Sequence, residues 1–247
     1  MSNELFIDLG NSRVKWMYAD RGVQEGAVHI GQPLGELLDG KWKHLPAPDQ
    51  IWLASVAPSP VRDALTEWTR QNWGMEPCPL AVQPVACGVT CGYREPEQLG
   101  VDRWMAIIAG YHHSPGGVCV VDCGTATTLD MVDGKGRHFG GFILPGMEMM
   151  RNCLLRGTAM DVEIEETELS EWGNSTASCI DLGIRESVVS LVESSVERMQ
   201  AAGVCDPGVI LCGGASALVE PHLKLAHEHR DALVLEGMMR FVQELKR

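Results

Sequence analysis

The chain of 247 residues lacks an excess of positive charge. Its 20 Lys and Arg residues stand against 33 Asp and Glu residues, which gives a formal net charge of −13. Such a surface repels nucleic acid and anionic membranes, and no basic stripe offsets it, so we expect neither as a partner. An acidic protein that binds a polyanion must gather positive potential locally, from a few Lys or Arg side chains, backbone N–H groups or a bound cation.

Long apolar runs are missing as well. No stretch approaches the roughly 18 apolar residues of a membrane-spanning helix. The start, Met1-Ser2-Asn3-Glu4, is polar, and the apolar run after it stops at Asp8, so we expect no signal peptide and a cytoplasmic protein. The nine cysteines form no C-x-x-C pair, and this predicts reduced, mostly structural thiols, with a zinc site or redox role as the alternative.

The two halves of the chain repeat one order of short strands. Apolar or alternating runs predict two three-stranded meanders, at 5–7, 13–18 and 23–30 and again at 118–121, 127–132 and 138–143. The first strand of each meander ends in Asp-x-Gly, as Asp8-Leu9-Gly10 and as Asp122-Cys123-Gly124.

A later buried strand in each half extends the repeat, and a predicted helix follows each one. These strands are 51–56 and 209–212, and the predicted helices are 60–72, 101–112, 146–156, 177–201, 217–228 and 236–246. We therefore expect a duplicated α/β unit, with an N-terminal lobe over 1–113 and a C-terminal lobe over 114–247.

Tight glycine turns at strand ends expose the backbone N–H groups that bind phosphate. The segment Asp8-Leu9-Gly10-Asn11-Ser12 fits this description, and Lys15 follows it as a possible point charge for phosphate oxygens. Asp8 is a candidate ligand of Mg²⁺, directly or through water. A single Asp-x-Gly is an ordinary turn, but two at the same place in matching meanders favour phosphate binding.

The second turn, Asp122-Cys123-Gly124-Thr125, adds a hydroxyl at Thr125 and a carboxylate at Asp122. Two carboxylates that face one polyphosphate repel it unless cations intervene, so this arrangement predicts a metal requirement. After the strand 209–212, Gly213-Gly214-Ala215 lets backbone approach a flat ligand such as adenine, although a helix start that needs small residues reads the same way.

A helix begins at Gly100-Val101-Asp102-Arg103. An Asp at this place is often a helix cap. In a cleft beside a γ-phosphate it could instead accept the proton of a substrate hydroxyl. Arg103 could bind an anionic group, and in a bidentate manner if that group is a carboxylate.

Several motifs, in this order, resemble those of the type III pantothenate kinases, members of the acetate and sugar kinase/Hsp70/actin superfamily. The matching segments are Ile7-Asp8-Leu9-Gly10-Asn11-Ser12-Arg13-Val14-Lys15, Gly100-Val101-Asp102-Arg103, Val120-Val121-Asp122-Cys123-Gly124-Thr125, Gly140-Gly141-Phe142-Ile143-Leu144-Pro145-Gly146, Gly173-Asn174-Ser175-Thr176 and Cys212-Gly213-Gly214-Ala215. The resemblance runs through nearly the whole chain. It implies an α/β fold of two duplicated ribonuclease-H-like (actin-like ATPase) lobes around a central cleft.

The resemblance also implies the activity: a pantothenate kinase that converts ATP and pantothenate into ADP and 4′-phosphopantothenate, the first step of coenzyme A biosynthesis. Asp102 is then the general base, and Asp122 is the ligand of a monovalent cation, K⁺ or NH₄⁺. A homodimer is implied too. The ATP contacts implied are Asp8, Leu9, Gly10, Asn11, Ser12, Arg13, Val14, Lys15 and Thr125. The pantothenate contacts implied are Tyr93, Gly100, Val101, Asp102, Arg103 and Thr176, the last reached across the dimer interface or from the second lobe.

Two other functions stay open at this point. One is a different small-molecule kinase of the superfamily, and the other is a non-catalytic transcription accessory protein on the same scaffold. Replacement of the aspartate at position 8, 102 or 122 by another residue would favour the second alternative, but all three aspartates are present.

Overall fold

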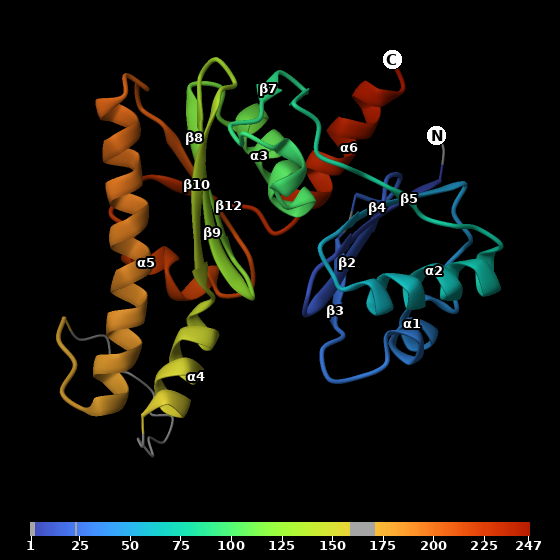
Figure 1. Cartoon of the computed structure of the whole chain (residues 1–247), viewed down its shortest axis with the longest axis horizontal. Coiled ribbons are helices and arrows are strands. Elements are labelled where there is room, and N and C mark those ends of the chain that lie inside the picture. The colour runs from blue at the N-terminus through green and yellow to red at the C-terminus, as the bar shows by residue number, and fades with distance from the viewer. Residues whose placement is uncertain (1–2, 23, 159–170) are drawn as a thin grey trace. The chain divides into compact units, whose positions relative to one another are not determined.

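The structure, a computed structural model, describes residues 3–22, 24–158 and 171–247. The chain divides into two compact units, and each unit contains one five-stranded sheet (Figure 1). The first unit comprises Met1–His113 together with Ala232–Arg247, and the second comprises Ser114–Asp231.

The first sheet has the order β3-β2-β1-β4-β5. Its strands are β1 (Glu4–Leu9), β2 (Arg13–Tyr18), β3 (Glu25–Val28), β4 (Gln50–Ser55) and β5 (Cys78–Pro79). The first three strands form an antiparallel meander, whereas β4 lies parallel to β1 and β5 lies parallel to β4. The meander predicted from the alternating sequence pattern is confirmed.

The second sheet repeats this plan, in the order β10-β9-β8-β11-β12. Its strands are β8 (Gly117–Cys123), β9 (Ala126–Asp133), β10 (His138–Pro145), β11 (Gly208–Cys212) and β12 (His227–His229). Again the first three are antiparallel, and β11 and β12 continue in parallel from β8. The identical order and directions confirm the predicted duplication of the sheet.

One face of the first sheet is covered by α1 (Leu34–Trp42) and α2 (Ser59–Trp73). Large aromatic side chains fill the space between them. The ring of Trp42 stacks on Trp73 with centroids 5.6 Å apart and meets Trp16 and Trp68 edge-on. The sequence did not predict α1, although Leu34, Leu38 and Trp42 recur at the four-residue spacing of a helix face and are all buried.

The other helices of this unit are α3 (Val101–His113) and α6 (Leu233–Leu245). They pack closely because Gly237 has no side chain: a Cβ at that position would lie 1.8 Å from the carbonyl oxygen of Met105. Sequence order alone assigned residues 232–247 to the second lobe. The packing of α6 against α3 and β1 instead makes this helix part of the first unit.

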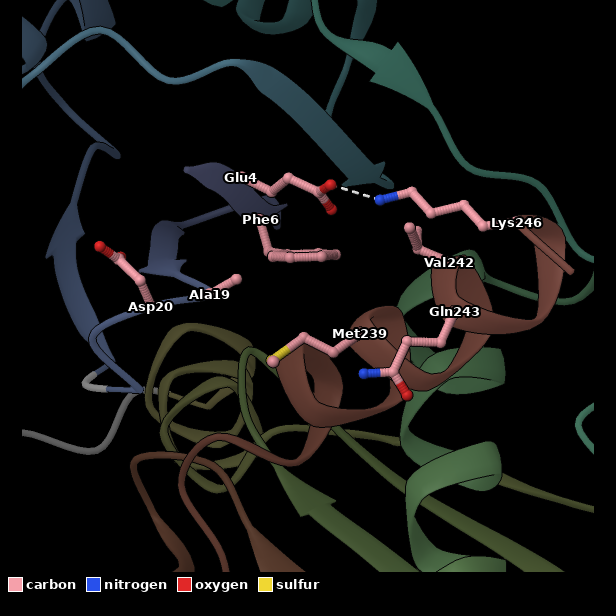
Figure 2. A pocket seen from close by; sticks show the side chains of 8 residues that line it. All are labelled: Glu4, Phe6, Ala19, Asp20, Met239, Val242, Gln243 and Lys246. Atoms are coloured by element: carbon pink, nitrogen blue, oxygen red, sulfur yellow. Dashed lines mark hydrogen bonds and ion pairs between the residues drawn. The ribbon is translucent and has the colours of Figure 1, made fainter. Parts of the chain in front are cut away.

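The last turn of α6 is also tied to the first strand of the chain. The ammonium group of Lys246 pairs with the carboxylate of Glu4 (Figure 2). The same carboxylate accepts a hydrogen bond from the Trp52 indole. A pocket of about 340 Å³ lies between this end of β1 and α6, with Phe6 and Val242 on its apolar side. None of the predicted site residues lines it.

In the second unit, α4 (Met147–Gly157) and α5 (Thr176–Ala201) follow the meander. The side chain of Ser175 caps α5 by accepting a hydrogen bond from the backbone N–H of Ser178. Along α5, Val188, Val192 and Val196 are buried against the sheet. The predicted helices 146–156 and 177–201 are confirmed.

The predicted helix over 217–228 is wrong. The segment contains two short 3₁₀ turns, η2 (Ser216–Leu218) and η3 (Glu220–His222), before the edge strand β12. Pro221 accounts for the break, since it lacks a backbone N–H and its ring disfavours an α-helix that passes through it. Residues 227–229 then pair with β11, which completes the second sheet.

Candidate active site

The first predicted phosphate turn closes tightly at the end of β1. The N–H of Gly10 donates to the carbonyl oxygen of Arg13 across 3.0 Å. Leu9 and Val14, on either side, are fully buried in the core. Their side chains are therefore closed to a ligand, whereas Asn11 and Arg13 are exposed.

Asp8 and Lys15 occupy directly opposite positions on β1 and β2. Opposite residues of an antiparallel pair project from the same face of the sheet. The carboxylate of Asp8 is buried, and Lys15 is half-buried beside it. The sequence predicts an acidic and a basic side chain on either side of this turn. The strand register pairs these two residues with each other.

One residue that holds this turn was not predicted. His29, which is 5% exposed, donates from Nε2 to the carbonyl oxygen of Gly10 across 2.9 Å. Its backbone N–H also donates to the carbonyl oxygen of Ser12, at 2.9 Å. Because His29 follows β3, nothing local in the sequence connects it with a turn nineteen residues earlier.

Asp102 lies in the first turn of α3, where its Oδ1 accepts a hydrogen bond from the N–H of Arg103 across 2.7 Å. The carboxylate lies against Gly100: a Cβ on that glycine would be 2.6 Å from Asp102 Oδ1 and 3.6 Å from Val56 Cγ1. The N–H of Val56 in turn donates to the carbonyl oxygen of Leu9. These contacts connect Asp102 with the end of β1 that carries the first phosphate turn.

Arg103 and Tyr93 form the next pair. The guanidinium Nη1 of Arg103 donates to the hydroxyl oxygen of Tyr93 across 2.8 Å, and its carbon lies 5.7 Å from the ring centroid. Arg103 is 9% exposed, so a charged group is buried next to Asp102. Two residues that the sequence proposed as contacts for one anionic substrate therefore lie together.

In the second unit, Asp122 and the turn after it are enclosed by glycine. Gly213 adopts a φ of +90°, and a Cβ on it would lie 2.4 Å from Asp122 Oδ1 and 2.5 Å from the carbonyl carbon of Cys123. The N–H of Ala215 donates to the carbonyl oxygen of Cys123 across 3.0 Å. Gly213 therefore lets the end of β11 approach the Asp122 turn closely.

Gly146 holds the same turn from another side. Its N–H donates to the carbonyl oxygen of Thr125, and a Cβ there would lie 2.5 Å from the carbonyl oxygens of both Gly124 and Thr125. Thr125 itself is exposed. From the sequence, Gly146 was a position of a family motif with no assigned role. In the structure it stabilises the second turn through its hydrogen bond to Thr125.

Thr176 is the first residue of α5 and is exposed. The chain folds over this helix start because Gly173 has no side chain: a Cβ would lie 2.6 Å from the backbone nitrogen of Cys179. Trp172, next to it, is 80% exposed. Thr176 belongs to the second unit, together with Asp122 and Thr125, whereas the other predicted site residues belong to the first.

A larger pocket of about 800 Å³ lies within the second unit, between α4, α5 and the 3₁₀ turns η2 and η3. Its lining includes Ala217 and Leu218, which follow the Gly213-Gly214 turn, and Arg151, which pairs with Asp181 at 3.0 Å. In the part of the chain that the structure describes, Nη2 of Arg151 and Nε of Arg185 are buried without a hydrogen-bond partner. Both groups can donate to an acceptor on a bound molecule.

Neither a clustered metal site nor a membrane helix is found in the described residues. Among residues 3–22, 24–158 and 171–247, no three His, Cys, Asp or Glu side chains are placed to share a metal ion. None of the helices in those ranges is long and apolar enough to cross a membrane. All nine cysteines are described, and none forms a disulfide.

Comparison with known proteins assigns the chain to a family. The family model described as type III pantothenate kinase matches residues 4–198. A type III pantothenate kinase from Halorhodospira halophila is 37% identical to the chain over 247 residues, which cover 95% of this chain and 96% of that protein.

Among solved structures, one from Campylobacter jejuni, described as a candidate transcriptional activator of the Baf family, has a TM-score of 0.65 at 18% identity and covers 98% of both chains. An archaeal actin homolog has a TM-score of 0.53 at 10% identity, with 98% of this chain and 99% of that chain covered. At these identities the likeness concerns the fold alone, and it confirms the predicted α/β fold of the actin-like ATPases. The sequence of the chain matches the family model and a relative of nearly the same length, and these matches identify the chain as a member of the type III pantothenate kinase family.

Proposed function

We propose that the chain transfers the γ-phosphoryl group of ATP to the hydroxyl group of pantothenate, giving ADP and 4′-phosphopantothenate in the first step of coenzyme A biosynthesis. The observation that carries this proposal is the set Asp102, Arg103 and Tyr93 in the first unit. It combines a carboxylate at a helix start with a buried guanidinium group that is already oriented by a phenol, 2.8 Å away. Pantothenate offers a hydroxyl group to the first and a carboxylate to the second.

In the reaction, Asp102 accepts the proton of the pantothenate hydroxyl as that oxygen attacks the γ-phosphorus. The new O–P bond forms while the bond from the γ-phosphorus to the bridging oxygen breaks, and ADP leaves with that electron pair. Arg103 holds the substrate carboxylate, and Tyr93 fixes the guanidinium plane. Most of the rate gain comes from positioning and from stabilisation of charge rather than from covalent chemistry.

The backbone turns bind the phosphates. The turn between β1 and β2, supported by His29, is proposed to bind phosphate, and Lys15 adds a positive charge on the face of Asp8. In the second unit, the turn after Asp122 is proposed to bind phosphate through Thr125. The N–H groups of Gly146 and Ala215 hold this turn through its carbonyl oxygens, and the close approach leaves no room for a side chain at positions 146 and 213. The turn is therefore formed before ATP binds.

The oxygen donors at the two turns fit the cations expected for such a kinase. Mg²⁺ is usually held by one or two carboxylates together with substrate phosphates, which suits Asp8 alone and explains why no larger ligand cluster is required. Asp122 is the residue proposed to bind a monovalent cation, K⁺ or NH₄⁺. Its Oδ1 lies against two glycines: a Cβ on Gly213 would be 2.4 Å away, and a Cβ on Gly124 would be 3.3 Å away. When bound, these ions neutralise phosphate charge that the acidic chain would otherwise repel.

The adenosine part of ATP is assigned to the pocket of about 800 Å³ in the second unit. Its lining includes Met147, directly after Gly146, whose N–H donates to the carbonyl oxygen of Thr125, so a nucleotide with its phosphates at Thr125 can extend into it. The buried donors on Arg151 and Arg185 would meet acceptor atoms of the base or ribose. From the sequence, Gly213-Gly214-Ala215 was open to two interpretations, an approach to a flat ligand such as adenine or a helix start that needs small residues.

The chain is proposed to act as a homodimer. Trp172, four residues before Thr176, is 80% exposed, and Met149 and Leu154 on α4 are 47% and 43% exposed, so these apolar side chains are accessible to a partner. A second copy that covers them would also bring a partner close to Thr176, which is proposed to contact pantothenate. Light scattering of the wild type and of Trp172→Ala tests this point, and a monomeric wild type would overturn it.

The activity is tested by ADP release from ATP and Mg²⁺ with pantothenate, with pantetheine and with a panel of sugars, each with and without K⁺. We expect pantothenate to be the preferred acceptor and K⁺ to stimulate. ADP release that is faster with a sugar would assign another kinase activity, and no release with any acceptor and cation would overturn the proposal.

A further inference from the structure

A short hairpin leads into Tyr93 and has no role in the mechanism above. Its two strands are β6 (Val85–Ala86) and β7 (Val89–Thr90). The N–H of Cys91 closes it by donating to the carbonyl oxygen of Pro84 across 2.9 Å. Two residues later the chain reaches Tyr93, so the position of the hairpin influences where the tyrosine lies.

The turn of this hairpin has an unusual backbone. Cys87 has a φ of +50°, in the left-handed region that side chains with a Cβ seldom adopt, and Gly88 follows with a φ of +78°. Cys87 is also buried, at 7% exposure. A non-glycine residue keeps such a conformation only where its surroundings hold it there.

Two helices hold Cys87 from opposite sides of its backbone. The carboxylate Oε1 of Glu244, on α6, accepts from the N–H of Cys87 across 2.7 Å. The imidazole Nε2 of His112, on α3, donates to the carbonyl oxygen of Cys87 across 2.9 Å. Burial and the adjacent Glu244 carboxylate together raise the pKa of the Cys87 thiol to about 11, so the sulfur stays neutral beside this anion.

The same segment is held again at its other end, by the hydrogen bond from Arg103 to Tyr93. Residues 87–93 therefore run beside α3, with one anchor at His112 near the end of the helix and the other at Arg103 near its start (Figure 1). We define residues 85–93 as the strap. All of its anchors lie in the first unit.

We propose that Glu244 and His112 are positioning residues that, by fixing the strap at Cys87, set the place of Tyr93 and hence the affinity for the acceptor substrate. This inference rests on the proposed function, in which Arg103 holds the pantothenate carboxylate and Tyr93 fixes the guanidinium plane. Neither Glu244 nor His112 is among the residues proposed to contact the substrate. Loss of either contact leaves a buried backbone group of Cys87 without a partner and lets the turn relax from its left-handed conformation. Tyr93 then no longer meets Arg103 in the same geometry.

The test compares Glu244→Ala with Glu244→Gln, which keeps an acceptor oxygen for the Cys87 N–H. Gln243→Ala, a neighbouring exposed position of α6, is the matched control. For Glu244→Ala we expect the KM for pantothenate to rise about tenfold, with the KM for ATP and kcat changed by less than about twofold. Glu244→Gln should restore most of the affinity. His112→Ala should behave like Glu244→Ala, and His112→Gln should be milder because its amide can still donate.

Hydrogen–deuterium exchange adds a readout of the strap itself, and we expect faster exchange confined to residues 85–93 in Glu244→Ala. Unchanged exchange there, or faster exchange with an unchanged KM for pantothenate, would overturn the proposal. Tyr93→Phe separates this proposal from the function. If the wild type phosphorylates pantothenate and Tyr93→Phe raises its KM while Glu244→Ala does not, the strap proposal fails and the function stands. If the wild type does not act on pantothenate, the function fails first.

Discussion

The imidazole Nε2 of His29 donates a hydrogen bond to the carbonyl oxygen of Gly10, which lies at the centre of the first phosphate turn, across 2.9 Å. We expect His29→Ala to raise the KM for ATP and to lower the free energy of unfolding by about 0.5–1.5 kcal/mol, because a partly buried acceptor loses its donor. Steady-state kinetics and urea unfolding measure the two effects. His29→Gln, whose amide can still donate, is the matched variant and should lie between wild type and alanine. A KM for ATP that is unchanged in His29→Ala would show that the turn needs no such support.

Removing the basic oxygen of Asp102 should abolish most of the turnover. In Asp102→Asn the amide oxygen can still accept from the Arg103 N–H, so the helix start keeps its bond, but the group can no longer take up a proton. We expect kcat to fall by about 10² to 10⁴, while the melting temperature stays within about 2 °C of wild type. Near-native turnover would remove Asp102 from the role of base.

Gly213 should not tolerate a methyl group. In Gly213→Ala the new Cβ would lie 2.4 Å from Asp122 Oδ1, at a φ of +90° that alanine rarely adopts. We expect loss of the stimulation by K⁺ and a stability loss of about 1–3 kcal/mol. Gly183→Ala, on α5, is the control, since a Cβ there meets nothing within 4 Å and alanine favours a helix. Retained stimulation by K⁺ in Gly213→Ala would separate Asp122 from the cation site.

The thiols should react in two groups. Cys153, Cys179 and Cys205 are exposed, whereas Cys119 and Cys123 are fully buried and burial raises the pKa of each to about 12. At pH 8 iodoacetamide should therefore modify the first three quickly and spare the other two until the protein unfolds. Peptide mass spectrometry over time measures this, and early labelling of Cys123 would contradict the packing around the second turn.

Alkaline pH should destabilise the fold through the same groups. The folded-state pKa values of Cys119, Cys123 and Tyr18 lie near 12, above their ordinary values of 9.0 and 10.0, with burial as the main cause in each case. Their stabilising contribution is full below the unfolded-state pKa and is lost as pH rises toward 12. We expect urea unfolding to show a free energy that declines above about pH 9, by at most about 1.4 kcal/mol per pH unit for each group. A value that is flat from pH 8 to 11 would contradict this.

The sequence predicts best what is local. The Asp-x-Gly turns, the two meanders and the start of α3 follow from residues that are neighbours in the chain, and the structure contains all of them. The segment 217–228 was misread because its apolar residues suit a helix, while Pro221 and pairing with β11 favour turns and an edge strand.

Contacts between distant segments could not be predicted. His29 reaches Gly10, and Glu244 reaches Cys87 across 157 positions, and neither pair leaves a periodic pattern in one sequence. Glycines are an intermediate case: Gly213 and Gly146 were recognised as motif positions, but only the space around them reveals that each excludes a side chain.

The packing of α6 in the first unit has a consequence for the order of protein synthesis. This helix is made after the whole second unit, yet it pairs with Glu4 on the first strand and holds the hairpin that precedes Tyr93. The second unit, residues 114–231, is one contiguous segment, but residues 1–113 stay without α6 until residues 232–247 have also been made. A nascent chain that stops before residue 232 should therefore have an incomplete first unit, so synthesis of α6 decides when the acceptor site becomes usable.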